Sequence, residues 1–257
     1  MRTAAVSLPA FLVVCLVVAF PADGEAKCMS QTADAWPQPG SKLPANRPII
    51  VLEGSGNARS AIRELGKQSL HLVADDDRVA LRRIEILESE KDFTQLVLKA
   101  EDDLDAGSTY RLDTNRLKYK DSVVRLAWTC DGGKRLRWRA GPPDSRAPNL
   151  RSLKKIGAER KTLGCAPTTF VMLRPSIPDD NVDELIFRVV VTRKVKSGLK
   201  QTYWVKPNDE SELRVGHGMC GGEFDLEQGA SYQVKVQAID KAGNRSPVSD
   251  PLDVVGP

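Results

Sequence analysis

The chain has 257 residues, of which 41% are hydrophobic and 28% are charged, and its formal net charge is +4. This small excess of basic residues excludes a dedicated nucleic-acid binder, which concentrates many lysines and arginines on one surface. The length and the hydrophobic content suit two domains that each bury a core of their own.

Residues 1–26 have the pattern of a secretory signal peptide. Arg2 supplies the charged start, an apolar run extends from Leu8 to Phe20, and Gly24 and Ala26 form a small-residue cleavage site. Because this run is shorter than the roughly 20 residues that cross a bilayer, we expect cleavage rather than an uncleaved anchor. The mature chain, with a net charge of +5, would have no membrane span and would reside in the periplasm, at the cell surface or outside the cell.

Residues 27–140 form the first predicted domain. Apolar runs bounded by turn residues predict strands at 49–52, 69–74, 79–87, 94–100, 123–129 and 134–139, with a helical turn at 61–65. The segment from Pro37 to Asn46 reads P-x-x-G-x-x-L-P-x-N, and the segment from Leu104 to Leu112 reads L-x-x-G-S-T-Y-x-L. Both resemble segments of the bacterial Ig-like domains of surface-layer and adhesin proteins, the second one in part.

Residues 141–148 read G-P-P-D-S-R-A-P and form a predicted linker. Three prolines in eight residues cannot pair as an inner strand, because proline has no backbone N–H to donate. Proline also stiffens a chain, so we expect the linker to hold two domains apart within a limited range of angles.

Residues 149–257 form the second predicted domain, with strands at 150–156, 169–173, 185–193, 201–205, 212–215, 232–239 and 252–255. From Tyr232 to Ser246 the sequence reads Y-Q-V-K-V-Q-A-I-D-K-A-G-N-R-S, which is an alternating strand followed by a turn. This stretch resembles the last hairpin of fibronectin type III and related Ig-like domains. The resemblance implies an all-β chain of two antiparallel Ig-like/fibronectin type III-like β-sandwiches. No close internal repeat is evident.

Four cysteines remain after the leader: Cys28, Cys130, Cys165 and Cys220. Four cysteines allow three pairings. Because the linker leaves two on each side, we expect the disulfides Cys28–Cys130 and Cys165–Cys220. The alternative is one metal site made of four thiolates, but structural zinc sites usually bring their cysteines in close pairs, and these are far apart in sequence. We therefore expect no metal and no cofactor.

The segment from Gly216 to Gly222, G-H-G-M-C-G-G, permits two interpretations. One is an exposed loop that presents His217 and Met219 to a partner or to a soft metal such as copper. The other is a tight turn leading into a strand at 223–226, and we favour the turn because few further ligands lie nearby in sequence.

Basic residues crowd the end of the first domain and the linker. In the run from Arg135 to Arg139, the period of two places Arg135, Arg137 and Arg139 on one face of a strand. This face would bind an anionic glycan, a phosphate polymer or an acidic protein, or it is a solvated face that discourages edge pairing. Trp36, in the proline-rich lead-in, is the best candidate for an exposed sugar-stacking aromatic.

Catalysis is not expected. The chain contains only two histidines, His71 and His217, and neither lies in a Ser-His-Asp or Cys-His motif. The sequence therefore predicts an exported, non-enzymatic binding or structural module of the bacterial cell envelope or the secreted fraction. Its partner would be an unidentified protein or an anionic envelope polymer, recognised through loops, strand edges or the basic hinge. The alternatives are a periplasmic chaperone of the pilus type and an enzyme with a site between the domains.

Overall fold

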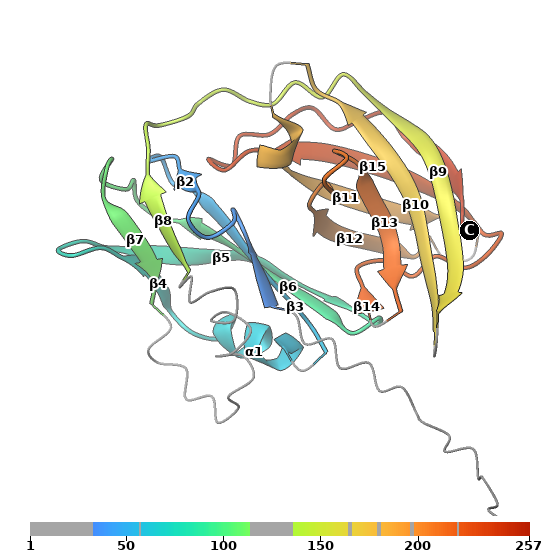
Figure 1. The fold of residues 1–257 in the computed structure, drawn as a ribbon, viewed down its shortest axis with the longest axis horizontal. Helices are drawn as coiled ribbons and strands as arrows, with labels where there is room; N and C mark the ends of the chain where they lie inside the picture. Colours follow the sequence, from blue (N-terminus) through green and yellow to red (C-terminus); the bar gives the residue numbers. More distant parts are fainter. Residues whose placement is uncertain are drawn as a thin grey trace, which may run out of the picture.

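The computed structural model describes residues 33–56, 58–113, 136–163, 166–178, 181–195, 198–219 and 221–257. β-Strands are the predominant regular structure of these residues, which confirms the predicted all-β class (Figure 1). Among them, no helix is long and apolar enough to cross a membrane.

The first half of the chain forms one eight-stranded sheet in the order β1-β3-β6-β5-β4-β7-β8-β2. All neighbouring strands are antiparallel except β2 and β8, which are parallel. The strands are β1 Ala33–Trp36, β2 Lys42–Leu43, β3 Ile49–Ser55, β4 Leu70–Val73, β5 Arg78–Ser89, β6 Phe93–Ala100, β7 Thr109–Leu112 and β8 Arg137–Ala140. Continuous hydrogen bonding thus joins strands that the Ig-like resemblance would divide between two sheets.

Strand β5 connects the two parts of this sheet. Its first residues pair with β4 and the rest pair with β6, and the register shifts between Arg83 and Glu85. A bulge of this kind bends a strand and lets it serve two differently oriented groups of strands. The sheet can therefore curve around a core whose largest members include Tyr110 and Trp138.

The helix α1, Ala58–Leu65, covers one face of β3 and β6. Its buried residues Ala58, Ala61, Ile62 and Leu65 follow the helical period, so one stripe faces the core. A Cβ at Gly54 would lie 2.9 Å from the carbonyl oxygen of Ala58. The absence of a side chain at Gly54 therefore permits the close approach of the helix to β3.

The second half forms two four-stranded sheets, β14-β13-β10-β9 and β12-β11-β15-β16, whose apolar faces share one core. Alternating residues such as Val189 and Val191 of β11, and Val234 and Val236 of β15, are buried there. The strands are β9 Ser152–Leu163, β10 Ala166–Ser176, β11 Ile186–Arg193, β12 Lys200–Val205, β13 Leu213–Gly218, β14 Gly221–Gly222, β15 Ser231–Ile239 and β16 Leu252–Val255, with a 3-10 turn η1 at Val182–Glu184.

The same tyrosine-centred corner occurs in both halves. The Tyr110 hydroxyl accepts the backbone N–H of Asp105 at 2.9 Å, and the Tyr232 hydroxyl accepts the backbone N–H of Glu227 at 2.8 Å. In each corner the acidic residue is followed two positions later by a glycine with positive φ, 94° at Gly107 and 72° at Gly229. The segments read L-D-A-G-S-T-Y and L-E-Q-G-A-S-Y, so the chain does contain a short internal repeat that the sequence analysis missed.

The backbone around the two corners is also paired equivalently. Gly107 N–H donates to the carbonyl of Ala140 at 2.8 Å, and Gly229 N–H donates to that of Gly256 at 3.0 Å. The returning bonds, from Ala140 to Ser108 and from Gly256 to Ala230, are both 2.9 Å long. Each half therefore anchors its last strand to the corner in the same way.

The two halves pack directly against each other. Trp36, Ile49 and Val51 of the first half form one buried cluster with Trp204 and Ile239 of the second, among others. Phe93, the first residue of β6, belongs to the core of the second half. Its ring packs edge to face against the ring of Tyr203, with 6.3 Å between the two ring centroids.

The proline-rich segment does not hold the halves apart as we expected. Its Asp144 carbonyl accepts the side-chain amide of Asn46 at 2.6 Å and that of Asn244 at 3.0 Å, so residues from both halves hold the segment in place. The apolar area shared by the halves explains the difference, because its burial favours contact whatever the stiffness of the connection.

Candidate functional site

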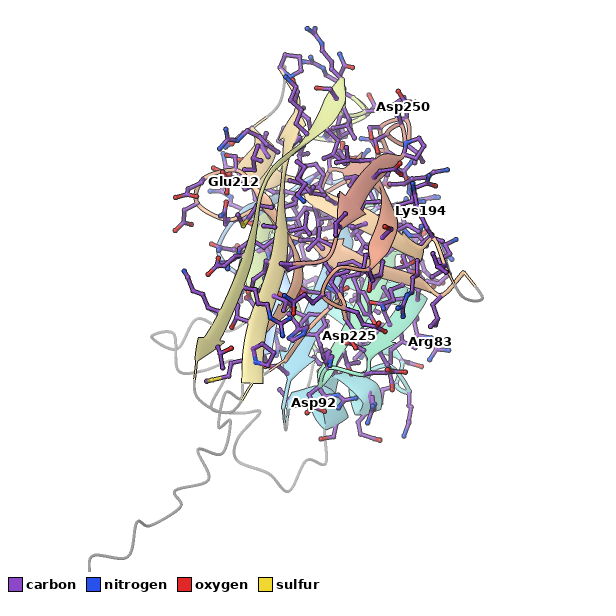
Figure 2. All side chains as sticks on the ribbon, turned by 90° about the vertical axis from the view of Figure 1, so that its right-hand side faces the viewer. Arg83, Asp92, Lys194, Glu212, Asp225 and Asp250 are labelled. Atoms are coloured by element: carbon purple, nitrogen blue, oxygen red, sulfur yellow. The ribbon has the colours of Figure 1, made fainter. Side chains whose placement is uncertain are left out.

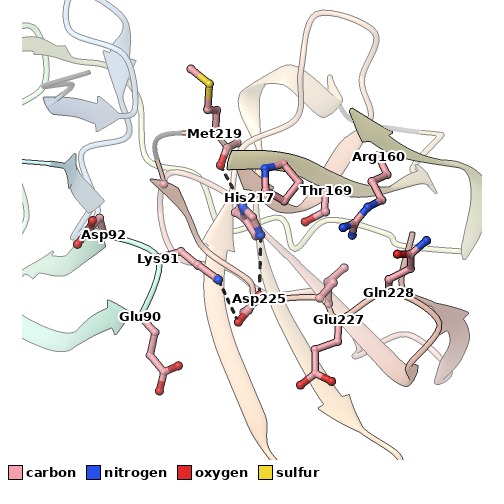
Figure 3. Close-up of a pocket in the computed structure, with 14 residues that line it drawn as sticks. Glu90, Lys91, Asp92, Arg160, Thr169, His217, Met219, Asp225, Glu227 and Gln228 are labelled. Atoms are coloured by element: carbon pink, nitrogen blue, oxygen red, sulfur yellow. Dashed lines mark hydrogen bonds and ion pairs between the residues drawn. The ribbon is translucent and has the colours of Figure 1, made fainter. Parts of the chain in front are cut away.

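A polar pocket of about 460 Å3 lies where two hairpins from different halves meet (Figure 3). The turn between β5 and β6 contributes Glu90, Lys91 and Asp92, while β10, β13 and the segment after β14 contribute Thr169, His217 and Asp225. Asp92 of the first half and Asp225 of the second lie at the same end of the molecule (Figure 2). This pocket is the candidate site because it gathers polar groups from both halves.

Glycines bring the two hairpins into contact. The N–H of Gly222 donates to the carbonyl of Lys91 at 3.0 Å. Gly221 has a φ of 141°, and a Cβ there would lie 2.7 Å from the same carbonyl oxygen. A side chain at Gly221 would therefore push the hairpins apart, which gives a backbone reason for the glycine-rich sequence at this point.

His217 lies at the end of β13, with 7% of its surface exposed. Its Nδ1 is 3.0 Å from the carbonyl oxygen of Gly218, so Nδ1 carries the proton of this hydrogen bond. Its Nε2 faces Oδ1 of Asp225 at 3.8 Å, and the other carboxylate oxygen of Asp225 is 3.3 Å from Nζ of Lys91. Asp225 thus lies between two groups that can carry positive charge.

Thr169 is the cross-strand neighbour of His217 in the β10–β13 pair. It is 2% exposed, and its hydroxyl has no hydrogen-bond partner among the described residues. Both ring nitrogens of His217 are directed elsewhere, so no base is hydrogen-bonded to this hydroxyl as a nucleophilic mechanism requires. The arrangement is suited to holding a polar group rather than to activating Thr169.

The structure brings together two of the predicted site residues and separates the others. His217 and Met219 line the same pocket, but His217 is buried in a strand rather than presented in an exposed loop. The segment from Gly216 to Gly222 is a hairpin of β13 and β14, and no strand follows at 223–226 as we expected.

The predicted basic face is only partly formed where we expected it. Arg137 and Arg139 are exposed on β8 while Trp138 between them is buried, as the alternation predicts. However, β8 pairs with β7 on one side and with β2 on the other, so it is not an edge strand. Arg135 lies outside the described residues.

Trp36 is not an exposed aromatic. It is 4% exposed at the end of β1 and belongs to the apolar cluster between the halves, so the prediction of a sugar-stacking platform there is wrong. The local sequence is rich in proline and polar residues, and it gives no sign of the second half that covers this ring.

The cysteines fall outside the described part of the chain. Neither Cys28–Cys130 nor Cys165–Cys220 is therefore tested, and the leader at 1–26 lies outside it as well. Among the described residues, no group of three or more His, Cys, Asp or Glu side chains is placed to hold a metal ion.

Sequence reasoning missed the role of Lys91, Thr169 and Asp225. The turn at Glu90–Asp92 is recognisable as a polar break between two strands, but nothing local shows that it meets β13 and β14. Their convergence depends on contacts between residues far apart in the chain, such as Lys91 with Gly222 and Asp225, which no local pattern encodes.

A second group of charged residues lies between the halves, outside this pocket. Lys206 forms ion pairs with Asp34 of β1 and with Glu53 of β3. Burial lowers the pKa of Lys206, but the charges of Glu53 and Asp34 outweigh burial and raise it overall. Burial and repulsion from Glu53 raise the pKa of Glu223 to about 8, although Lys206 opposes the shift.

Comparisons with known proteins do not assign this chain to a family. No known protein family matches it, and no curated protein is significantly similar. Among solved structures, it is similar to pullulanase type I from Bacillus subtilis str. 168 complexed with maltose, with 10% identity, 87% of this chain and 24% of that chain covered, and a TM-score of 0.24. It is also similar to the N-terminal part of the bacterial S-layer protein SbsC, with 12% identity, 87% and 44% covered, and a TM-score of 0.20. The chain thus spans less than half the length of either structure.

Proposed function

We propose that this protein is an exported, non-enzymatic binding or structural module of the cell envelope or the secreted fraction. The observation that carries the proposal is the pocket of Figure 3, in which Thr169 lies beside His217 and its buried hydroxyl has no hydrogen-bond partner among the described residues. An unmet buried hydrogen-bonding group is costly unless something binds it, and here no base is poised to make it react. The pocket is therefore suited to recognition.

The Ig-like architecture belongs to the same proposal. Each half has a tyrosine whose hydroxyl binds the backbone five residues upstream, as in the tyrosine corner that is a hallmark of Ig-like sandwiches. On this basis we assign the Ig-like domains to residues 27–140 and 149–257, joined by 141–148, with disulfides Cys28–Cys130 and Cys165–Cys220. Peptide mapping without reduction tests the pairing, because a cross-linked peptide from both halves would contradict these domain boundaries.

The rival chaperone of the pilus type would need basic side chains that converge between the domains to grip a subunit. The groups found between the halves are mostly carboxylates, including Glu53, Glu85 and Asp34, and the basic groups Lys206 and Arg188 are paired with them. These ion pairs favour a fixed contact between the two halves over a binding site for the terminus of a pilus subunit.

An affinity capture from the native envelope fraction tests the binding function. The mature protein serves as bait, with washes at low and then high salt, beside the variants Thr169→Val and Thr94→Val. Thr94 is a matched control, because it is also buried and its hydroxyl also has no hydrogen-bond partner in the described part of the chain, but it does not line the pocket. We expect a defined partner that survives high salt and is lost only with Thr169→Val. Salt-labile, heterogeneous anionic material would instead indicate general charge binding.

A further inference from the structure

Strand β9 has a long free edge. It pairs with β10 along Ser152–Leu163 and is the last strand of its sheet. Among the described residues, no backbone hydrogen bond from outside the sheet reaches the strand itself; the neighbouring Arg151 N–H donates to Ser176 at the end of β10. Figure 2 views the molecule from the side on which β9 and β10 run along the surface. An edge of this kind presents N–H and C=O groups that another strand can bind.

The other edge strands are shorter or are already occupied. β1, β2, β14 and β16 have two to four residues each. β12 is longer, but the Gln95 side chain binds both the N–H and the C=O of Trp204. Among the outermost strands in the described part of the chain, β9 is therefore the longest one whose outer side has no backbone hydrogen-bond partner.

The charge of β9 is strongly one-sided. Its basic residues are Lys154, Lys155, Arg160 and Lys161, and its one acidic residue is Glu159. The Glu159 carboxylate is already shared, at 2.7 Å from Lys161 and 3.1 Å from Arg214. The exposed Lys154 and Lys155 have no carboxylate partner among the described residues, so positive charge remains on this edge.

Between the two basic pairs lies an uncharged stretch of Ile156, Gly157 and Ala158. Ile156 is 40% exposed, which is unusual for a large aliphatic side chain in a strand of this protein. The edge thus offers, in order, two positive charges, a small apolar centre and two more positive charges.

We propose that the β9 edge binds an acidic, extended polypeptide segment, which adds to the sheet as a further strand. This inference goes beyond the proposed function and concerns a second surface, the edge of β9, rather than the pocket at His217. Backbone hydrogen bonds to β9 would supply general affinity, and carboxylates on either side of the apolar centre would bind the two basic pairs.

A second copy of the chain is a poorer occupant. Antiparallel pairing of two β9 strands about Gly157 and Ala158 would place Lys154 opposite Lys161 and Lys155 opposite Arg160. Like charges directly opposite each other in a sheet are destabilising. Charge complementarity therefore favours an acidic partner over self-association.

The test uses the full mature protein and a blocked peptide of alternating glutamate and valine. A second peptide of equal charge carries proline at two central positions, so it cannot donate the same backbone hydrogen bonds. Titration measures the dissociation constants, and amide hydrogen exchange measures the protection of residues 152–163. We expect the alternating peptide to bind and to protect β9 amides, and the proline peptide to bind about tenfold more weakly.

Charge reversal on β9 provides a second test of the proposal. The double variant Lys154→Glu/Lys155→Glu should weaken peptide binding about tenfold or more, since two repulsions replace two attractions. The matched control, Lys200→Glu/Lys235→Glu, changes the net charge equally at exposed positions in the other sheet and should bind like the wild type.

Three outcomes would overturn the assignment: equal binding of both peptides, binding without protection of β9, or a β9-dependent dimer. In the capture from the envelope fraction, a protein that is lost with Lys154→Glu/Lys155→Glu but retained with Thr169→Val would support the β9 site.

Discussion

The side-chain amide of Gln95 in the first half pairs with both backbone polar groups of Trp204 in the second. Gln95 Nε2 donates to the Trp204 carbonyl at 2.6 Å, and Gln95 Oε1 accepts the Trp204 N–H at 2.9 Å. Gln95 is fully buried, and Trp204 is 1% exposed. One side chain thus acts as a neighbouring strand would, and it closes the edge of β12 while joining the two halves.

Replacement of Gln95 should uncouple the halves. Gln95→Leu leaves the buried N–H and C=O of Trp204 without partners, and we expect a loss of about 2–4 kcal/mol in the free energy of unfolding. Thermal unfolding followed by tryptophan fluorescence should then show two transitions instead of one.

Gln201→Leu is the control for this experiment. Gln201 binds the backbone of Asp225 in the same two-bond manner, at 3.0 and 3.4 Å, but both residues belong to the second half. This variant should lower stability without separating the transitions. A single transition in Gln95→Leu would show that the apolar cluster alone couples the halves.

Glu223 should make stability depend on pH. An unfolded glutamate titrates near pH 4.3, whereas burial and Glu53 raise the pKa of Glu223 to about 8 in the folded chain. Between these values the unfolded chain loses the proton and the folded chain keeps it, so this group's stabilising contribution is full at low pH and falls as the pH rises to about 8. The upper limit of the slope is about 1.4 kcal/mol per pH unit.

Glu223→Gln should remove this dependence. The variant should be more stable than the wild type at pH 8.5 and should differ little from it at pH 4, as measured by urea unfolding at each pH. Glu210→Gln, at an exposed position, provides the control. Parallel stability curves for wild type and Glu223→Gln would contradict the raised pKa.

The tyrosine corner should stabilise each half. Tyr232→Phe removes the acceptor of the Glu227 N–H and should cost about 1 kcal/mol in chemical unfolding. Tyr110→Phe should cost more, because its hydroxyl also donates to Asp77 and both bonds are lost. Burial, with a contribution from Asp77, raises the pKa of Tyr110 to about 12, so alkaline titration should ionise this tyrosine unusually late.

Gly216 should tolerate no side chain. Its φ is 154°, and a Cβ would lie 1.9 Å from the carbonyl oxygen of Thr169, so Gly216→Ala should cost about 3 kcal/mol or more and disturb the pocket. Gly107→Ala is the control, because Gly107 also has positive φ but no atom of the described residues lies within 4 Å of its Cβ position. That variant should lose about 1 kcal/mol. Equal losses of stability in the two variants would mean that the positive φ, and not the contact with Thr169, accounts for the cost of a side chain at Gly216.

Local patterns predicted most strands of the second half to within a few residues. Val234, Val236 and Ala238 alternate with polar neighbours, and all three are buried in β15 as the period of two predicts. The alternation of Arg137, Trp138 and Arg139 likewise gave the correct buried face. The short edge strands β1 and β2 were missed, because two to four residues carry too little pattern to recognise.

The sequence by itself determined the all-β class, the strand faces and the turn at each tyrosine corner, because these depend on neighbouring residues and on glycines that allow positive φ. Only the tertiary structure decided the joint between the halves, the burial of Trp36 and the pocket at His217. Each of these depends on apolar surface and polar partners from distant parts of the chain. The open edge of β9 depends on both the sequence and the tertiary structure. Its basic residues can be read from the sequence, whereas the absence of a neighbouring strand among the described residues is a property of the folded sheet.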